Sequence, residues 1–60
     1  MSLKQAVEAL RSQGYLVDAR RLIRGRDDSP YIVSVSRGSR CYEVVARSVR
    51  EGVDRIARIV

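Results

Sequence analysis

The chain has 60 residues, and its twelve basic and seven acidic side chains give a net charge of +5 and an isoelectric point near 10.4. A domain of this length buries only about 60% of the surface of its unfolded chain, so its core is thin. One cysteine and no histidine exclude an intrachain disulfide and a transition-metal ligand set. No apolar run is long enough to span a bilayer, and no secretory leader pattern is present. We expect one domain, residues 1–60, in a reducing cytoplasm, with no cofactor and no membrane partner.

Residues 3–13 carry the signals of an amphipathic helix. Ser2 and Gln5 have the spacing of a capping box, in which each side chain bonds the backbone N–H of the other residue. Gly14 follows the last turn, and Tyr15 then stands where a Schellman ending makes its apolar contact with the helix. One face repeats apolar residues at helical spacing, namely Leu3, Ala6, Val7 and Leu10.

Residues 15–24 fit two local structures. As a helix, Asp18 would cap a short turn that ends at Gly25, and a helix-turn-helix with a β wing would result. The strand is favoured, because tyrosine, leucine and valine begin it directly after Gly14. It has one face with Tyr15, Val17, Ala19, Arg21 and Ile23, and another with Leu16, Asp18, Arg20, Leu22 and Arg24. Residues 25–30 then form a loop, and Pro30 starts the next strand where a missing N–H is tolerated.

The middle of the chain predicts a β-hairpin whose register can be assigned. Gly38 and Ser39 suit the centre of a type II′ turn, which has glycine first. The pairs are then Arg37 with Arg40, Val35 with Tyr42, Val33 with Val44, and Tyr31 with Ala46. These residues share one side of the hairpin, whereas Ile32, Ser34, Ser36, Cys41, Glu43 and Val45 share the other. A slip of one residue would scramble both faces, so the agreement supports the register.

The last helix is predicted from a second capping box, Ser48 with Glu51, and from an apolar stripe with helical spacing. Ion pairs are expected between Glu51 and Arg55 and between Asp54 and Arg58, at i,i+4. Gly52 inside the helix costs up to about 1 kcal/mol relative to alanine, which indicates close packing against a neighbour.

These elements predict an α+β fold with the order helix, three antiparallel strands, helix, and with both helices on one face of the sheet. The order is that of double-stranded RNA-binding domains. The chain has neither a lysine pair at the start of the last helix nor a histidine-bearing loop between strands. We therefore assign no family, since a shared topology is weak evidence of function.

The basic residues gather in the middle of the chain, where residues 20–40 hold six arginines and two aspartates. Such a balance favours an anionic partner, and arginine suits bidentate contacts with phosphate. We expect a small accessory or regulatory protein that binds nucleic acid, either DNA or RNA. Its expected phosphate contacts are Arg20, Arg21, Arg24, Arg26, Arg37 and Arg40. The two tyrosines of the hairpin point toward the core, which argues against recognition of single strands by stacking.

The alternative is a protein-binding module or inhibitor of the kind found in compact phage or plasmid genomes. Its contact surface would be Leu16, Ile32 and Val45 on the open face of the sheet. A homodimer is also expected as an option, because a thin core without a disulfide or a metal often needs a second subunit.

Catalysis is not expected. Acid–base and nucleophilic mechanisms need a positioned proton carrier, and the chain offers no histidine, one lysine and one cysteine, Cys41. Asp27 and Asp28 are adjacent, but two carboxylates alone do not hold a divalent cation. We assign no catalytic and no metal residues.

Overall fold

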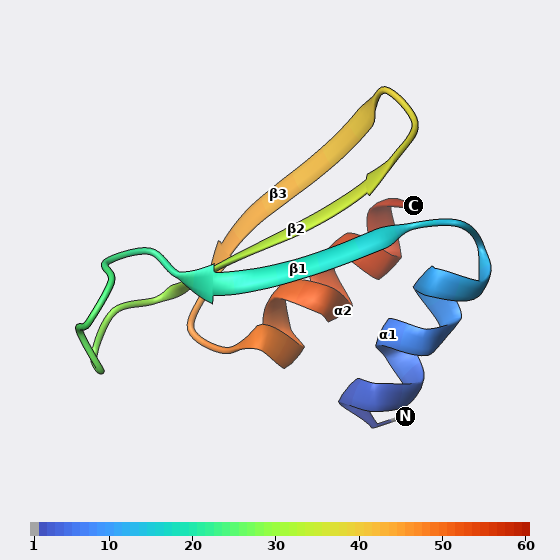
Figure 1. Ribbon diagram of the computed structural model, residues 1–60. Coiled ribbons are helices and arrows are strands. Elements are labelled where there is room, and N and C mark those ends of the chain that lie inside the picture. The colour runs from blue at the N-terminus through green and yellow to red at the C-terminus, as the bar shows by residue number, and fades with distance from the viewer. Residues whose placement is uncertain (1) are drawn as a thin grey trace.

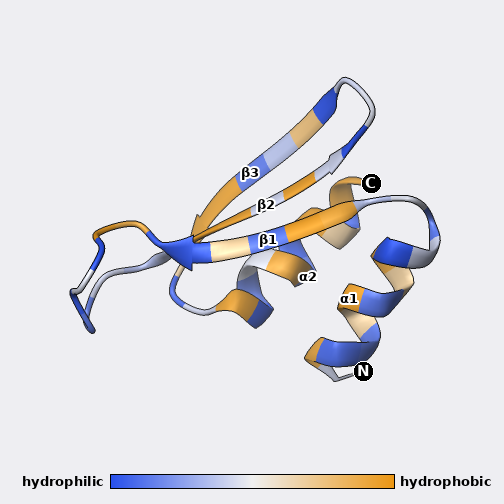
Figure 2. Cartoon of the chain, viewed as in Figure 1, coloured by the Kyte–Doolittle hydropathy of each residue, from blue (hydrophilic) through white to orange (hydrophobic). Residues whose placement is uncertain are grey.

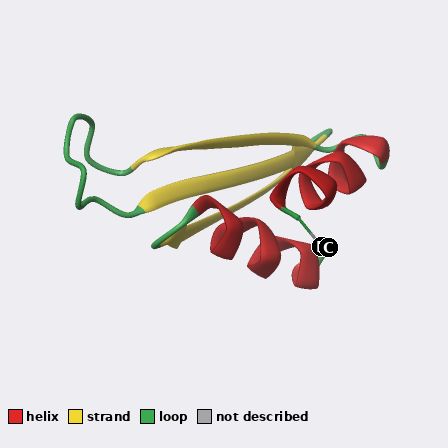
Figure 3. Ribbon diagram, turned by 90° about the horizontal axis from the view of Figure 1, so that it is seen from below, coloured by secondary structure: helices red, strands yellow, loops and turns green. Residues whose placement is uncertain are grey.

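The computed structural model describes residues 2–60 and confirms the predicted fold class (Figure 1). Its elements are α1 (Leu3–Ser12), β1 (Leu16–Arg21), β2 (Tyr31–Arg37), β3 (Arg40–Ala46) and α2 (Val49–Ile59). The three strands are antiparallel in the order β1-β2-β3. Both helices lie on one face of this sheet, and no described element covers the other face (Figure 3).

Helix α1 has the predicted caps at both ends, although it ends at Ser12, one residue earlier than predicted. The Ser2 hydroxyl accepts the N–H of Gln5 at 3.2 Å, and the Gln5 side chain accepts the N–H of Ser2 at 3.0 Å. At the other end Gly14 has φ of 89°, and the N–H of Tyr15 donates to the Leu10 carbonyl at 3.1 Å. This Schellman ending turns the chain directly into β1. The alternative helix over residues 18–24 is therefore wrong.

Strand β1 is shorter than predicted and ends at Arg21. The N–H of Leu22 still donates to the Pro30 carbonyl at 2.8 Å, but the N–H of Ile23 donates to the hydroxyl of Ser29 at 2.8 Å. That side-chain bond ends the alternation of faces. Ile23, which we placed on the core face, is consequently 52% exposed, whereas Ser29 is buried.

The predicted hairpin register is confirmed at every pair from Tyr31 with Ala46 to Arg37 with Arg40. Gly38 has φ of 61°, and within residues 2–60 no residue other than glycine has positive φ. A type II′ turn requires this combination, because only its first central residue is left-handed.

The core lies between the sheet and the helices, and its apolar stripes are visible in Figure 2. Gly52 of α2 lies against β2, where an added Cβ would stand 2.9 Å from the Cβ of Val33. The close packing predicted for this glycine is confirmed, and it brings α2 down onto the sheet. The buried cluster comprises Ala6, Leu10, Tyr15, Val33, Val35, Val53 and Ile56.

Helix α2 begins at the predicted cap, since the Ser48 hydroxyl accepts the N–H of Glu51 at 3.1 Å. The Glu51 carboxylate accepts the N–H of Arg47 at 3.3 Å instead of that of Ser48, so the predicted capping box is only half formed. None of the helices in residues 2–60 has the length and apolar content needed to cross a membrane.

Candidate nucleic-acid interface

The structure places the predicted phosphate-binding arginines at the two ends of the sheet. Tyr31 of β2 lies between Arg21 of β1 and Ala46 of β3. The loop at residues 22–30 and the start of α2 therefore leave the sheet at the same end (Figure 1). Arg37 and Arg40 lie at the opposite end, beside the hairpin turn. The six arginines therefore form two groups, one at each end of the sheet.

Five arginines lie at the end of the sheet where β1 and β3 stop and β2 begins, or in the segments that follow these two strands. We call them the loop-end arginine cluster, and they are Arg20, Arg21, Arg24, Arg26 and Arg47. A surface depression lies within this cluster, and its lining residues are Arg20, Arg21, Leu22, Arg24 and Gly25. Three arginines and no acidic residue thus line one hollow. Asp18 lies 3.6 Å from Arg20 but does not line the hollow, so an anion that enters it meets arginine side chains.

Arg21 holds the loop in place. Its Nη1 donates to the carbonyl of Asp27 at 2.8 Å and to the carbonyl of Ser29 at 3.0 Å. The guanidinium carbon also lies 4.7 Å from the ring centroid of Tyr31, within the range of a cation–π contact. This explains the arginine on the core face of β1, where the sequence placed it among apolar residues.

Arg20 and Arg26 each have a weak acidic partner. Arg20 lies 3.6 Å from the carboxylate of Asp18, and Arg26 lies 3.2 Å from that of Asp28. The hydrogen bond from Arg26 lowers the pKa of Asp28, with a smaller contribution from its own backbone N–H. All four side chains are more than 60% exposed. Exposed pairs of this kind contribute little to stability, so they can open when a phosphate offers a better partner.

Arg24 and Arg47 have no ion pair and no side-chain hydrogen bond to other described residues. We had not assigned Arg47 to the site. The predicted register contained the necessary signal, because it put Ala46 opposite Tyr31 and so placed the next residue beside the loop.

At the other end of the sheet, Arg37 has a structural contact and Arg40 does not. Arg37 Nη1 donates to the carbonyl of Gln13 at 3.2 Å, and its guanidinium carbon lies 4.5 Å from the ring centroid of Tyr15. It therefore fastens the hairpin to the end of α1. Within residues 2–60 the Arg40 side chain makes no ion pair and no hydrogen bond.

The open face of the sheet is not basic. Its three rows across the strands are Leu16, Ser36 and Cys41; Asp18, Ser34 and Glu43; and Arg20, Ile32 and Val45. Two acids and one arginine give these nine residues a net charge of −1. Of the six predicted phosphate contacts only Arg20 belongs to these nine residues. The open face of the sheet is therefore unsuited to binding a polyanion. Leu16 and Val45 are exposed there, at 74% and 51%, and Ile32 is half-buried.

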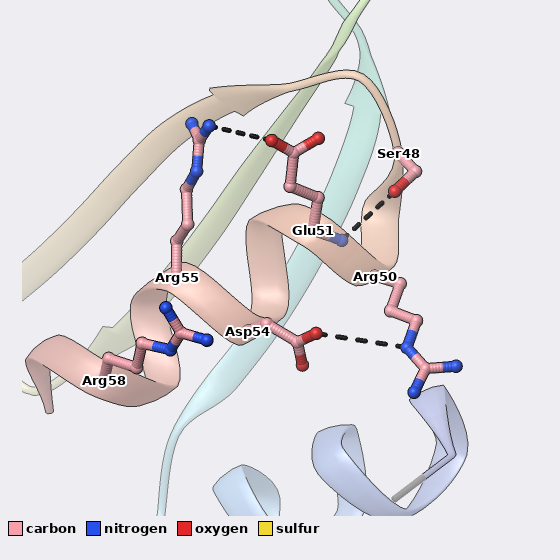
Figure 4. A pocket seen from close by; sticks show the side chains of 6 residues that line it. All are labelled: Ser48, Arg50, Glu51, Asp54, Arg55 and Arg58. Carbon is pink, nitrogen blue, oxygen red and sulfur yellow. Dashed lines mark hydrogen bonds and ion pairs between the residues drawn. The ribbon is translucent and has the colours of Figure 1, made fainter.

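The arginines of α2 differ from the loop-end arginine cluster because acids lie among them (Figure 4). Arg55 lies 2.8 Å from Glu51, as predicted. The predicted pair of Asp54 with Arg58 is wrong, since Asp54 lies 3.9 Å from Arg50 instead. Helical Cα–Cβ bonds tilt toward the N-terminus, and this directs the short Asp54 side chain to the preceding turn.

Within residues 2–60 no group of three His, Cys, Asp or Glu side chains is placed to hold a metal ion. The loop end offers guanidinium groups, which can donate hydrogen bonds and attract anions. No protein-family model, no curated protein and no solved structure matches the chain.

Proposed function

We propose that the protein binds the phosphate backbone of nucleic acid through the loop-end arginine cluster. The observation that carries the proposal is the hollow at residues 20–25, which three arginines and no carboxylate border. Arg24 brings a guanidinium without a protein partner. Arg20 and Arg26 add positive charge, because their ion pairs with Asp18 and Asp28 are exposed and weak. Arg21 holds the loop in its conformation.

Duplex nucleic acid fits this surface better than single strands. Single-strand binders stack bases on exposed aromatic rings, and the open face of this sheet carries none, because Tyr31 and Tyr42 lie on the helix side. Contacts limited to phosphates position a protein without reading sequence. We therefore propose binding that varies little with base sequence, with the hairpin-tip Arg40 as a second contact along the backbone.

The test is fluorescence anisotropy with labelled double-stranded DNA, double-stranded RNA and single-stranded DNA at about 50 and 200 mM salt. The variant Arg24→Ala/Arg47→Ala removes two unpaired charges from the cluster. Arg11→Ala/Arg58→Ala removes the same charge from exposed helical positions and is the matched control.

We expect the cluster variant to weaken duplex binding and to flatten the salt slope by about two units, since each lost phosphate contact contributes about 0.9. The control should keep most of the slope. Equal losses in both variants would show that the charge acts generically and would refute the assignment of the site.

A second candidate function rests on the open face of the sheet, where Leu16 and Val45 are exposed and the net charge is not positive. This surface suits contact with protein. Changing Ile32 and Val45 to threonine would abolish such a contact and leave nucleic-acid binding unchanged, so the same titrations separate the two functions.

A further inference from the structure

Strand β1 is an edge strand, and its outward backbone groups can be identified. The N–H of Leu22 donates to the carbonyl of Pro30, which lies opposite in the ladder. Hydrogen-bonded and non-bonded pairs alternate along antiparallel strands. The even-numbered residues of β1 therefore bond β2, and the N–H and C=O groups of Val17, Ala19 and Arg21 point away from the sheet. No backbone hydrogen bond from another described element reaches these three residues.

The sequence of β1 is complementary to itself when two copies pair antiparallel about Ala19. Each residue then faces the one equally far beyond Ala19 in the other copy. Asp18 faces Arg20 of the partner subunit, and Leu16 faces Leu22 of the partner subunit. Ala19 and its counterpart exchange hydrogen bonds, so these two facing pairs occupy the non-hydrogen-bonded sites. Cα atoms there approach to about 4.5 Å, and the side chains lie closest.

We propose that the protein forms a two-fold symmetric dimer in which β1 pairs with β1 of a second copy, giving one continuous six-stranded sheet. Charge and apolar surface both support this partner. Asp18 and Arg20 already lie 3.6 Å apart in one chain, and the dimer alternates four such charges on the open face. Leu16 and Leu22, which are 74% and 47% exposed, cover each other across the two-fold axis.

The other edge of the sheet does not offer the same pairing. The outward groups of β3 belong to Cys41, Glu43 and Val45, and symmetric pairing about the central one would place Glu43 opposite itself. Like charges directly opposite each other destabilise a pair of strands. In addition, Arg55 Nη1 donates to the Val45 carbonyl at 3.3 Å and occupies an acceptor that a new strand needs. A charged residue and a covered carbonyl are common protections of an edge.

The dimer forms without nucleic acid, although it shares Arg20 and Leu22 with the hollow at the loop end. Antiparallel pairing brings the loop-end arginine cluster of one copy and the hairpin tip of the other copy to the same end of the strands. Each end of the six-stranded sheet would then carry basic residues from both copies. Because association is measured without nucleic acid, its failure would leave the proposed function standing.

Sedimentation equilibrium over a concentration series tests the dimer. Arg20→Asp places two like-charge pairs across the two-fold axis, and we expect the dissociation constant of the dimer to rise about tenfold or more. Arg40→Asp makes the same change of net charge away from the interface and should leave association unchanged. The double exchange D18R/R20D inverts both charges, places opposite charges across the axis again, and should restore the dimer.

A second variant and a second readout do not depend on charge. Ala19→Pro removes the outward N–H at the centre of β1 without removing a bond to β2, and it should give a folded monomer by circular dichroism. In the wild type, amide exchange at Val17, Ala19 and Arg21 should slow as concentration rises, whereas Glu43 should exchange at a constant rate. A wild type that is monomeric at every concentration would overturn the proposal. So would a dimer that Arg20→Asp weakens no more than Arg40→Asp, or one that D18R/R20D fails to restore.

Discussion

Replacing Gly52 with alanine tests the contact that fixes α2 on the sheet. In an exposed helix this change stabilises a protein by about 1 kcal/mol. Here the new Cβ would overlap the Cγ2 of Val33, and it would lie 2.9 Å from the Cβ of Val33 and 3.4 Å from the Cγ2 of Val44. Val33 is fully buried in the central strand, so it can move aside only by displacing other core side chains.

Overpacking of a filled core costs about 1–3 kcal/mol, and the gain in helix propensity offsets about 1 kcal/mol of that. We therefore expect Gly52→Ala to lower the free energy of unfolding by up to about 2 kcal/mol, the opposite sign from an exposed site. For a domain of this size the melting temperature should fall by up to roughly 15 °C. Urea denaturation and thermal melting followed by circular dichroism measure both quantities.

The double variant with Val33→Ala isolates the cause. Val33→Ala is destabilising by itself, because it removes core methyl groups. It also removes the Cγ2 atom that the new Cβ would overlap, so adding Gly52→Ala in that background should be neutral or stabilising. The reasoning is refuted if Gly52→Ala stabilises the wild type, or if it costs the same in both backgrounds.

Three further outcomes follow from contacts at the two ends of the sheet. Arg37→Ala should lower the free energy of unfolding by about 1 kcal/mol, because it loses a ring contact and a hydrogen bond to the end of α1; Arg40→Ala should change it by less than about 0.5 kcal/mol. Ser29→Ala removes the acceptor for a loop N–H, so proteolysis within the loop should become faster while the global melting temperature changes little. The carboxyl of Asp28 should titrate in NMR below its ordinary pKa of 3.8, and Arg26→Ala should raise that midpoint. Since the folded-state pKa is the lower one, the stabilisation by this pair is present above about pH 4 and is lost as the pH falls through the folded pKa.

The sequence predicted the hairpin well, because two independent constraints agree there. Gly38 allows only a few turn types, and the alternation of apolar residues on both sides fits one register. The end of β1 was not predictable in the same way. It depends on the hydroxyl of Ser29, which accepts the N–H of Ile23 from six residues away and converts the predicted last residues of the strand into loop.

Composition showed that the chain is basic but did not show the structural or binding role of each arginine. Arg21 and Arg37 fall on the core side of the predicted strands, and this parity already sets them apart from Arg20. Their actual partners are tyrosine rings and backbone carbonyls that only the tertiary fold brings within reach. The sequence therefore predicted six equivalent phosphate contacts, whereas in the structure Arg21 and Arg37 contact tyrosine rings and backbone carbonyls and the other four do not.

Strand β1 is the element that would gain most from pairing with a second copy. It has no fully buried residue, whereas β2 buries Val33 and Val35 completely. In a domain with so thin a core, the edge strand is the place where a small gain in buried surface changes stability most. Pairing with a second copy would supply that gain, and only the folded chain can make it. We therefore expect the melting temperature of the wild type to rise with protein concentration, and that of Ala19→Pro to stay constant over the same range.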